Sequence, residues 1–596
     1  MDLKKFYREL IRRNVIRAVL AYLAVAWVLI EFASVILPTF DAPPYLLQGL
    51  IYLLAIGLIF WTGFAWVYDL SSEGWIKTPD WEDNTETRAA NTRRLNTVIA
   101  VSGIMAILLL LAGSFWAGSQ WGSPGVHESE KRIAVLPLEP KVAEIDDEYF
   151  AYGITDALIQ ELSQMEEFSV LSLASTQFLE AGILPTTDLY LQVSKDIDYF
   201  ISGSYEKNGY NLKVTLNISR EIDMAAIWSS TYEEDITNAA ALWSGIAKDI
   251  SEILGLGEQQ RNRLLEKNLR PVQPETYELY LKGKYYLNKP RVEDWERALV
   301  YYQEAVDKNP ADAYAYAGLA EGYITLGHNA LFPPDGVFPK ALAAAKRAIQ
   351  LDSMNANAWA ALSQYHTYYG WDWELAEYAF NRANSLNPNL AYNHYHRSWY
   401  LALFGRMEEA IEEHKRAKEI DPFSALHTVW LGGLYNMNGQ YELALKEAEI
   451  AAQMHDDYSL SSAIRGRAYI GLGQQEKGLE SYREAARLNK GWKYIFYGPL
   501  LFELGYREEG LEILKEVESL PESPFFSLSL ANMHFQDGNL DQTFYWLDKA
   551  KEHAWYAWTV RIFFASPEML QDPRYMALLD ELNLPPLEAG STILGI

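Results

Sequence analysis

The chain of 596 residues contains no cysteine. Without a thiol it can form no structural disulfide, no thiolate zinc site, no cysteine nucleophile and no lipid-modified cysteine anchor. Positive charge is also scarce, because 79 acidic side chains outnumber 51 basic ones and give a formal net charge of −28. Nucleic-acid binding requires clustered Lys and Arg side chains that neutralise phosphates. The composition therefore argues against a nucleic-acid partner.

Catalytic and metal-binding motifs are scarce as well. A catalytic site requires a nucleophile with a base, a metal cluster or a phosphate loop, and the sequence displays none of these motifs. His394 and His396 stand two positions apart, whereas two metal ligands on one helix face need a spacing of three or four. The run His455-Asp456-Asp457 could bind a cation, but a cluster this short more often forms a solvated turn. We predict no cofactor, no bound metal and no enzymatic activity.

An interval of 34 residues recurs through the second half of the chain. Equivalent positions are Pro310, Ser353, Pro388, Pro422, Asp456, Lys490 and Pro524, separated by 43, 35, 34, 34, 34 and 34 residues. This period indicates stacked helix pairs, none of which can bury a core alone. We predict an all-α solenoid of about eight pairs over 275–553 and a capping segment over 554–596. The concave face of such an array commonly holds another polypeptide.

The first interval is nine residues longer than the period, and the segment 328–336 supplies the difference between the two helices of the second unit. Insertions in repeat arrays map to loops and often to a binding edge. A loop with two prolines and one phenylalanine can equally be a passive elaboration. The sequence leaves both roles of the insertion open.

Three apolar runs, 18–37, 45–68 and 97–117, come before the repeats. Each is close to the roughly 20 residues that a helix needs to cross the hydrocarbon layer. A cleaved signal peptide is the alternative for the first run, but that run is too long and a second follows after seven residues. Lys and Arg are concentrated before the first run and between the second and third. By the positive-inside rule we predict a three-helix membrane anchor over 1–117, with a cytoplasmic N-terminus and the bulk of the chain on the other side.

Glu31 lies within the first apolar run. A carboxylate inside a membrane is by default a functional hypothesis, because an unpaired charge in lipid costs a few kcal/mol or more. Since Glu31 is within two turns of the outer end, it can also reach the interface or accept a hydrogen bond from a neighbouring helix. Its role stays open.

The segment 131–256 has a mixed pattern of strands and helices after a Gly- and Ser-rich linker at 118–130. Strands are predicted at 131–138 and 168–173, with an amphipathic helix at 148–165 between them. A meander follows at 199–205, 211–218 and 226–232, with Asn208-Gly209 as the first hairpin turn, and a helix follows at 239–256. We predict a small α/β domain over 131–256 and a linker over 257–274.

Five pieces of this segment resemble, in order, the small α/β domain similar to the N-terminal domain of TolB. They are "IAVLPLEP", "YFAYGITDALIQEL", "FSVLSLASTQF", "DYFISGSYEKNGYNLKVTLNI" and "IWSSTYEEDI". Such domains occur in the periplasmic parts of bacterial membrane sensors of the CadC type and beside adenylate cyclases. The resemblance implies a bacterial inner-membrane protein whose bulk is periplasmic. Only about 17 residues precede the first apolar run, so we expect no winged-helix or cyclase domain before it.

From residue 275 onward the units resemble tetratricopeptide repeats, for example in the small residues Ala410 and Ala417, seven apart on the second helix of the fourth unit. The resemblance implies that positions two, five and nine of each first helix face the groove. These groove candidates are Tyr314, Glu321, Tyr392, Tyr395, Trp399 and Arg467. Aromatic and Arg side chains are common interface anchors. Aromatic side chains can also fill the core between helices, so the sequence leaves groove and core open.

Two functions are compatible with this organisation. The first is a non-enzymatic scaffold, integral to the membrane, that presents the TolB-like domain and the solenoid to protein or peptide partners. The alternative is a transmembrane sensor whose periplasmic domains bind a small molecule or peptide and signal to a cytoplasmic partner. Only the segment of about 27 residues between the second and third runs would be available for that cytoplasmic contact. A homo-oligomer is compatible with both, whereas a hydrolase or transferase has little support.

Overall fold

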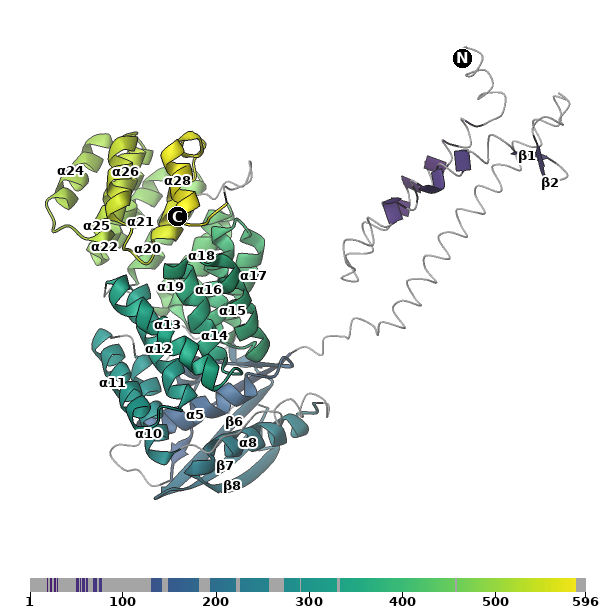
Figure 1. Cartoon of the computed structure of the whole chain (residues 1–596), viewed down its shortest axis with the longest axis vertical. Helices are drawn as coiled ribbons and strands as arrows, with labels where there is room; N and C mark the ends of the chain where they lie inside the picture. Colours follow the sequence, from purple (N-terminus) through teal and green to yellow (C-terminus); the bar gives the residue numbers. More distant parts are fainter. Residues whose placement is uncertain are drawn as a thin grey trace, which may run out of the picture. The chain divides into compact units, whose positions relative to one another are not determined.

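The computed structural model divides into two units, Met1–Ser129 and Glu130–Ile596. It describes residues 130–141, 148–181, 193–220, 226–256, 273–289, 291–329, 333–455 and 458–585, together with scattered residues between 15 and 77 (Figure 1). The third predicted membrane span lies outside the described residues, as do Glu31 and much of the first two spans. Among the residues that are described, no helix is both long enough and apolar enough to cross a bilayer.

In the first unit, the described residues of the first two apolar runs contact each other. The Tyr22 hydroxyl donates a hydrogen bond of 2.9 Å to the carbonyl oxygen of Leu54. A short antiparallel hairpin follows, formed by β1 (Tyr68–Ser71) and β2 (Gly74–Lys77). Strand β1 thus begins at the residue where the second predicted span ends.

The second unit begins with a sheet in the order β5-β3-β6-β7-β8, with β4 pairing β6. Its strands are β3 (Lys131–Val135), β4 (Glu139–Pro140), β5 (Phe168–Val170), β6 (Tyr199–Asn208), β7 (Asn211–Ser219) and β8 (Trp228–Asp235). Strand β3 pairs in parallel with β5 and β6. Parallel neighbours need crossover connections, which include α5 (Glu148–Leu162) and α6 (Leu173–Ala181). The sequence pattern did not predict α6.

The β6–β7 hairpin turns one residue later than predicted. Asn208 pairs with Asn211 in the ladder, so the two turn residues are Gly209 and Tyr210 rather than Asn208 and Gly209. Gly209 has a φ of 61°, in the left-handed region that glycine enters without a steric penalty. The glycine therefore fixes the turn, and the asparagine belongs to the strand.

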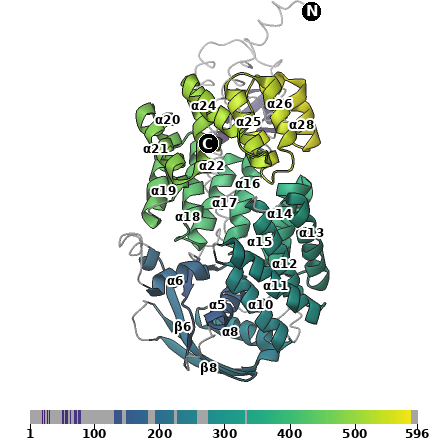
Figure 2. The same ribbon diagram turned by 90° about the vertical axis from the view of Figure 1, so that its left-hand side faces the viewer.

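The two faces of the sheet have different coverings (Figure 2). Ile133 and Val135 belong to one core with α5 and α8 (Ala239–Ile253), whereas Ala134, between them, belongs to a second core with α6. This alternation is the period of two expected of a strand that is buried on both faces. The first core also includes Leu281 of α10 (Pro274–Leu287). The first helix of the solenoid is thus packed into the α/β domain.

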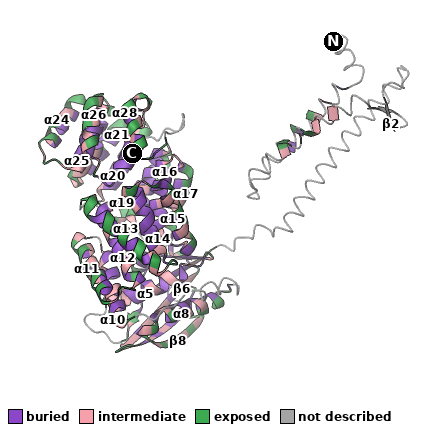
Figure 3. Ribbon diagram, in the orientation of Figure 1, coloured by how far each residue is buried: buried purple, intermediate pink, exposed green. Residues whose placement is uncertain are grey.

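Eight helix pairs follow within the described residues, and buried residues recur along the array (Figure 3). The pairs are α10 with α11 (Val292–Lys308), α12 (Ala313–His328) with α13 (Pro334–Leu351), α14 (Ala356–Tyr365) with α15 (Trp373–Leu386), α16 (Ala391–Leu403) with α17 (Met407–Ile420), α18 (Ala425–Met437) with α19 (Tyr441–Met454), α20 (Ser459–Gly471) with α21 (Gln475–Leu488), α23 (Gly498–Glu503) with α24 (Arg507–Glu518), and α25 (Pro524–Gln536) with α26 (Leu540–Lys549). The π-helical segment η3 (His366–Gly370) follows α14, and α22 (Lys490–Trp492) with η4 (Lys493–Tyr497) precedes α23.

The turn inside each of the last five pairs contains a glycine with positive φ. These are Gly405, Gly439, Gly473, Gly505 and Gly538, with φ between 71° and 85°. Glycine ends helices in this way because it lacks a Cβ that would clash in the left-handed conformation. The recurring glycine and the small buried residues, among them Ala417 with no exposed surface, are the local causes of the 34-residue period.

The C-terminal segment differs from a simple cap. It contains α27 (Tyr556–Phe563), η5 (Met569–Gln571) and α28 (Pro573–Glu581). Besides following the eighth pair, it returns to earlier ones. The Trp373 indole N–H donates to the carbonyl oxygen of Leu582 at 2.8 Å, and Arg561 Nε donates to that of Leu403 at 2.8 Å. The end of the chain is therefore held against the third and fourth helix pairs.

Candidate functional site

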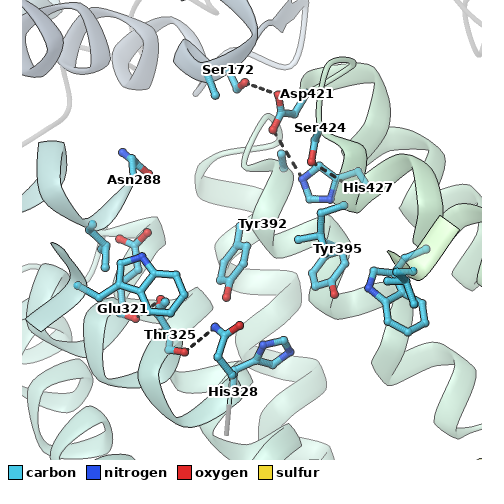
Figure 4. Close-up of a pocket in the computed structure, with 18 of the residues that line it drawn as sticks. Ser172, Asn288, Glu321, Thr325, His328, Tyr392, Tyr395, Asp421, Ser424 and His427 are labelled. Atoms are coloured by element: carbon cyan, nitrogen blue, oxygen red, sulfur yellow. Dashed lines mark hydrogen bonds and ion pairs between the residues drawn. The ribbon is translucent and has the colours of Figure 1, made fainter. Parts of the chain in front are cut away.

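A cavity of about 850 Å³ lies between the α/β domain and the inner face of the solenoid (Figure 4). Its wall includes residues of α5 and α6 on one side and of α10, α12, α16, α18, α20 and α25 on the other. These solenoid elements are the first helices of their pairs, which an array of this kind turns toward its concave side. The volume lies within the range of small-molecule pockets, about 300–1,000 Å³.

Helix α27 and the residues before it form another wall of this cavity. The Trp555 indole N–H donates a 2.8 Å hydrogen bond to the carbonyl oxygen of His328, and the two rings lie 4.6 Å apart. Trp558 contacts the fully buried Trp399 of α16, with ring centroids 5.4 Å apart. The concave face is thus crossed by the chain's own C-terminal segment.

The junction between the α/β domain and the solenoid contributes polar contacts to the wall. The Asn389 side-chain amide donates hydrogen bonds to the carbonyl oxygens of Phe168 at 2.7 Å and Ser163 at 3.1 Å. The Ser172 hydroxyl donates to Asp421 Oδ1 at 2.7 Å, a contact drawn in Figure 4. Asn389, Ser172 and Asp421 all line the cavity, so an occupant would touch the contacts that join the two domains.

One end of the cavity carries ionised groups. Lys284 Nζ lies 3.7 Å from Glu321 Oε2, and Lys284 and Asp156 are 6% and 9% exposed. Burial lowers the pKa of Lys284, but the charges of Glu321 and Asp156 outweigh burial and hold that pKa above its usual value. Burial and the nearby Asp156 carboxylate raise the pKa of Tyr152. This end therefore contains an ammonium group matched by two carboxylates.

The middle of the cavity is formed by neutral aromatic and imidazole groups. Figure 4 shows Tyr392 and Tyr395 side by side, with Glu321 on the side of Tyr392 and His427 next to Tyr395. The two tyrosine rings are stacked with centroids 6.1 Å apart and an interplanar angle of 13°. His427 is 5% exposed, and its Nε2 lies 3.9 Å from Asp421 Oδ2. Burial lowers the pKa of His427 despite that carboxylate, which favours the neutral form of the imidazole.

Further buried histidines surround the same space. Burial lowers the pKa of His328 to about 3 and that of His553 to about 4. His328 Nε2, His427 Nδ1, His553 Nε2 and the Trp558 indole nitrogen have no hydrogen-bond partner within the described part of the chain. Buried polar atoms normally have a partner, protein or water. These four nitrogens are covered by neighbouring protein atoms and are not open to the cavity.

Three of the six groove candidates come together at this cavity. Glu321, Tyr392 and Tyr395 line it. Tyr395 is only 1% exposed, so its ring belongs to the cavity wall and to the core at once. The first helices that carry these three residues also contribute other residues to the cavity wall.

The other three candidates lie elsewhere. Trp399 is fully buried beneath the cavity, 5.0 Å from the Trp430 ring. Arg467 Nη1 forms an ion pair of 2.8 Å with Glu503 Oε1. Tyr314 is 44% exposed on α12 and does not line the cavity. The structure therefore separates a core tryptophan, an ion-paired arginine and an exposed tyrosine from the cavity residues.

Sequence reasoning missed Asp156, Lys284, His328, Trp555 and Trp558. The sequence pattern assigns each of them another place: Asp156 to the helix of the α/β domain, Lys284 to the first repeat helix and His328 to the insertion. Trp555 and Trp558 fall in the predicted C-terminal cap. One signal was available, because residues 553–558 read His-Ala-Trp-Tyr-Ala-Trp. Such a density of aromatic side chains is more than a terminal cap needs to cover one helix pair.

No known protein-family model matches the chain. It is 24% identical over 309 residues to the transcriptional regulator HilA of Salmonella typhimurium, covering 51% of this chain and 53% of that protein. It is also 24% identical over 194 residues to putative adenylate cyclase 3 of Rhizobium meliloti, covering 32% of each. The chain spans about half the length of the Salmonella relative. A solved tetratricopeptide repeat protein from Parabacteroides merdae is 17% identical, with a TM-score of 0.33, covering 46% of this chain and 99% of that one.

Proposed function

We propose that this protein is a non-enzymatic, membrane-anchored sensor that binds a small molecule or a short peptide in the cavity between its α/β domain and its solenoid. The proposal favours the second of the two functions derived from the sequence. One observation carries it: the concave side forms a cavity of about 850 Å³ that is walled at once by the α/β domain, the solenoid and α27.

The crossing of the concave face by the C-terminal segment supports a compact ligand over a long polypeptide. A peptide that followed the array would have to displace Trp555 from the His328 carbonyl and Trp558 from Trp399. Trp558 is 6% exposed and Trp399 fully buried. Exposing a buried large apolar side chain to water costs about 1.5–3 kcal/mol, and two tryptophans would be exposed. A ligand that fits the existing cavity avoids this cost.

Binding in this cavity would also reach the junction between the domains. An occupant that contacts Asn389 and Asp421 changes the free energy of the hydrogen bonds that hold the α/β domain to the solenoid. A ligand shifts a conformational equilibrium only through contacts that differ between the two states. The junction supplies such contacts, which makes it the proposed route from ligand to signal.

The scaffold remains a second candidate because neighbouring repeats expose apolar side chains on another surface. Met354 and Tyr378 are 52% and 57% exposed. Arg382 Nη2 contacts the Met354 sulfur at 3.5 Å, and the Trp359 and Tyr378 rings are 5.7 Å apart. Partner proteins that bind there would leave the cavity free. Substituting Tyr378 by Ser and measuring stoichiometric co-purification of proteins distinguishes this candidate from the first.

Membrane anchoring and a periplasmic location are part of the proposal and rest on the apolar runs and the distribution of Lys and Arg. A reporter that is active only outside the cytoplasm should be active when fused after Gly125 and inactive when fused near Asn84. The reverse pattern would contradict the periplasmic assignment.

The binding proposal is tested by the small molecules that the full-length protein retains. We would purify the chain from its native membrane, denature it and analyse what is released by mass spectrometry. Ala391→Trp and Thr325→Phe enlarge two side chains that line the cavity. The control, Ala311→Trp, introduces the same tryptophan in an exposed turn. We expect one species, near one per chain, from the wild type and from Ala311→Trp, and none from the two filled variants. Equal release from all four proteins, or none from any, would contradict the proposal.

A further inference from the structure

The sheet of the α/β domain has two edges, and the solenoid closes one of them. At β5 the Asn389 side chain accepts a hydrogen bond from the Val170 N–H at 3.3 Å and donates one to the Phe168 carbonyl at 2.7 Å. At the other edge, β8 has no further strand beside it among the described residues (Figure 1). Strand β8 has eight residues, and a long open edge is a template for pairing with another chain.

The ladder with β7 determines which backbone groups of β8 point outward. The Ile236 N–H donates to the Tyr210 carbonyl at 2.8 Å, and bonded residues alternate with non-bonded ones along an antiparallel pair. Even-numbered residues of β8 therefore bond to β7. The N–H and C=O groups of Ser229, Thr231 and Glu233 point away from it. All three residues are exposed, and within the described part of the chain their N–H groups have no partner.

Charged side chains often protect an open edge, but the acidic side chains of β8 are directed to their own domain. Each accepts a hydrogen bond of 2.8–2.9 Å from a nearby residue: Glu233 from Asn211, Glu234 from Asn238 and Asp235 from Thr237. The Thr231 hydroxyl likewise lies 3.1 Å from that of Thr215 on β7. The outward backbone groups are thus left uncovered, and a basic segment would find carboxylates that already have partners.

A second copy of the same strand fits this edge. A two-fold axis that passes through the sheet plane at Thr231 places Thr231 opposite its own counterpart and Ser229 opposite Glu233 of the second copy. On the face covered by α8, Glu234 comes opposite Trp228. No carboxylate then lies directly opposite another, which is the arrangement that destabilises strand pairs, and paired threonines are favourable.

From these features we propose that two copies of this chain pair in antiparallel fashion through β8 and join their sheets into one. Ser229, Thr231 and Glu233 of each copy then donate and accept one backbone hydrogen bond each. Residues of β8 do not line the cavity. The inference therefore goes beyond the proposed binding function and does not depend on it.

The absence of cysteine makes a cross-linking test specific, because an introduced thiol has no other thiol in its own chain. Thr231→Cys in the purified full-length protein should give a covalent dimer under mild oxidation. Residues of a bonded antiparallel pair have Cα atoms about 5.5 Å apart, and a disulfide spans about 4.4–6.8 Å. Ser229→Cys is the matched control, since its counterpart lies about 13 Å away along the strands. It should cross-link only when mixed with Glu233→Cys.

Sedimentation of the cysteine-free chain tests the same contact without a covalent bond. Thr231→Lys places two like charges opposite each other and should raise the dissociation constant of the dimer at least tenfold. Ser204→Lys, on the same face of the sheet but on β6, should leave it unchanged. Thermal melting checks that each variant is folded. If Thr231→Lys is not, Thr231→Pro replaces it, because proline is tolerated where the N–H of an edge strand points outward.

The expected result is a covalent dimer from Thr231→Cys, none from Ser229→Cys alone, and a weaker dimer with Thr231→Lys. Equal cross-linking at both positions, or a dimer that Thr231→Lys leaves intact, would assign the contact to another surface and overturn the inference. A monomer at every concentration, alone or with a different protein bound at β8, would overturn it as well. None of these results depends on a species released from the cavity, so the two proposals can fail separately.

Discussion

The indole N–H of Trp555 donates a 2.8 Å hydrogen bond to the carbonyl oxygen of His328, 227 residues earlier in the chain. His328 is the last residue of the first helix of the second pair, and Trp555 immediately precedes α27. An array whose end contacts its second unit cannot offer an open groove along its whole length. The contact turns a concave face into a cavity.

Arg561 provides the first test of this closure. Its side chain is 1% exposed, and it donates to the carbonyl oxygens of Leu403 and Pro585. Arg561→Met should lower the free energy of unfolding by about 1.5–3 kcal/mol, because the carbonyl of the buried Leu403 loses its charged donor, and the carbonyl of the exposed Pro585 loses a second hydrogen bond. Urea denaturation followed by helicity measures the change. Arg574→Met, at a largely exposed ion pair, should cost less than about 1 kcal/mol, and equal losses would contradict the role of Arg561.

Asn389 tests the junction between the domains. Its amide group, 5% exposed, donates to Phe168 and Ser163 carbonyls and accepts from the Val170 N–H at 3.3 Å. Asn389→Ala should lower the free energy of unfolding by about 2–4 kcal/mol, since several buried groups lose their partner.

Asn309→Ala is the matched control for that change. Asn309 occupies the corresponding turn after α11, where its side chain accepts a hydrogen bond from Ala311 N at 3.1 Å. The control should shift the free energy of unfolding by about 1 kcal/mol or less. Denaturation curves of both proteins that agree within error would show that the junction does not depend on Asn389.

The double change Tyr395→Ala with Trp399→Ala distinguishes core from groove on α16. Both side chains are at most 1% exposed, and Trp399 lies between Trp430 and Trp558. Large-to-small changes of buried aromatic residues cost about 3–5 kcal/mol each, so we expect loss of helicity over the neighbouring pairs. Retained helicity, measured by circular dichroism, would place these two rings at a surface instead.

Buried histidines predict a loss of stability in acid. The pKa of His328 and of His414 is lowered to about 3 and that of His553 to about 4, each chiefly by burial. The unfolded chain binds protons below about pH 6.5, whereas these folded histidines do not, so stability falls with pH from there toward the folded pKa values. Each contributes up to about 2 kcal/mol between pH 6.5 and 5. His553→Asn should weaken the dependence of stability on pH, whereas His455→Asn, at an exposed position, should leave it unchanged. Equal free energies of unfolding of the wild type at pH 7 and pH 5 would contradict this prediction.

The repeats could be predicted because their causes are local. The glycine at Gly439 or Gly473 ends a helix through its own backbone freedom, and Ala417 marks a close approach within one pair. The cavity could not be predicted, because its walls meet through contacts between distant segments. Nothing local in Trp555 indicates His328 as its partner. Lys284 lies in a first helix like any other, and its importance follows only from Asp156, which the α/β domain brings beside it.

Position nine of the repeat shows the same limit. It holds Glu321 in the second pair, Trp399 in the fourth and Arg467 in the sixth. The resemblance to tetratricopeptide repeats implies that all three face the groove. Whether such a side chain lines the cavity, lies in the core or forms an ion pair depends on distant residues. Trp399 packs against Trp558 of α27, and Arg467 pairs with Glu503. Local pattern therefore gives the direction of a side chain, and the packing of remote elements gives its surroundings.

The most direct measurement is a cryo-electron microscopy map of the full-length protein purified from its native membrane. We expect density for a compact, non-protein molecule beside Tyr392, His427 and Trp492, and its absence in Ala391→Trp. An unoccupied cavity in the wild type, or density only on the outer surface near Tyr378, would contradict ligand binding between the α/β domain and the solenoid.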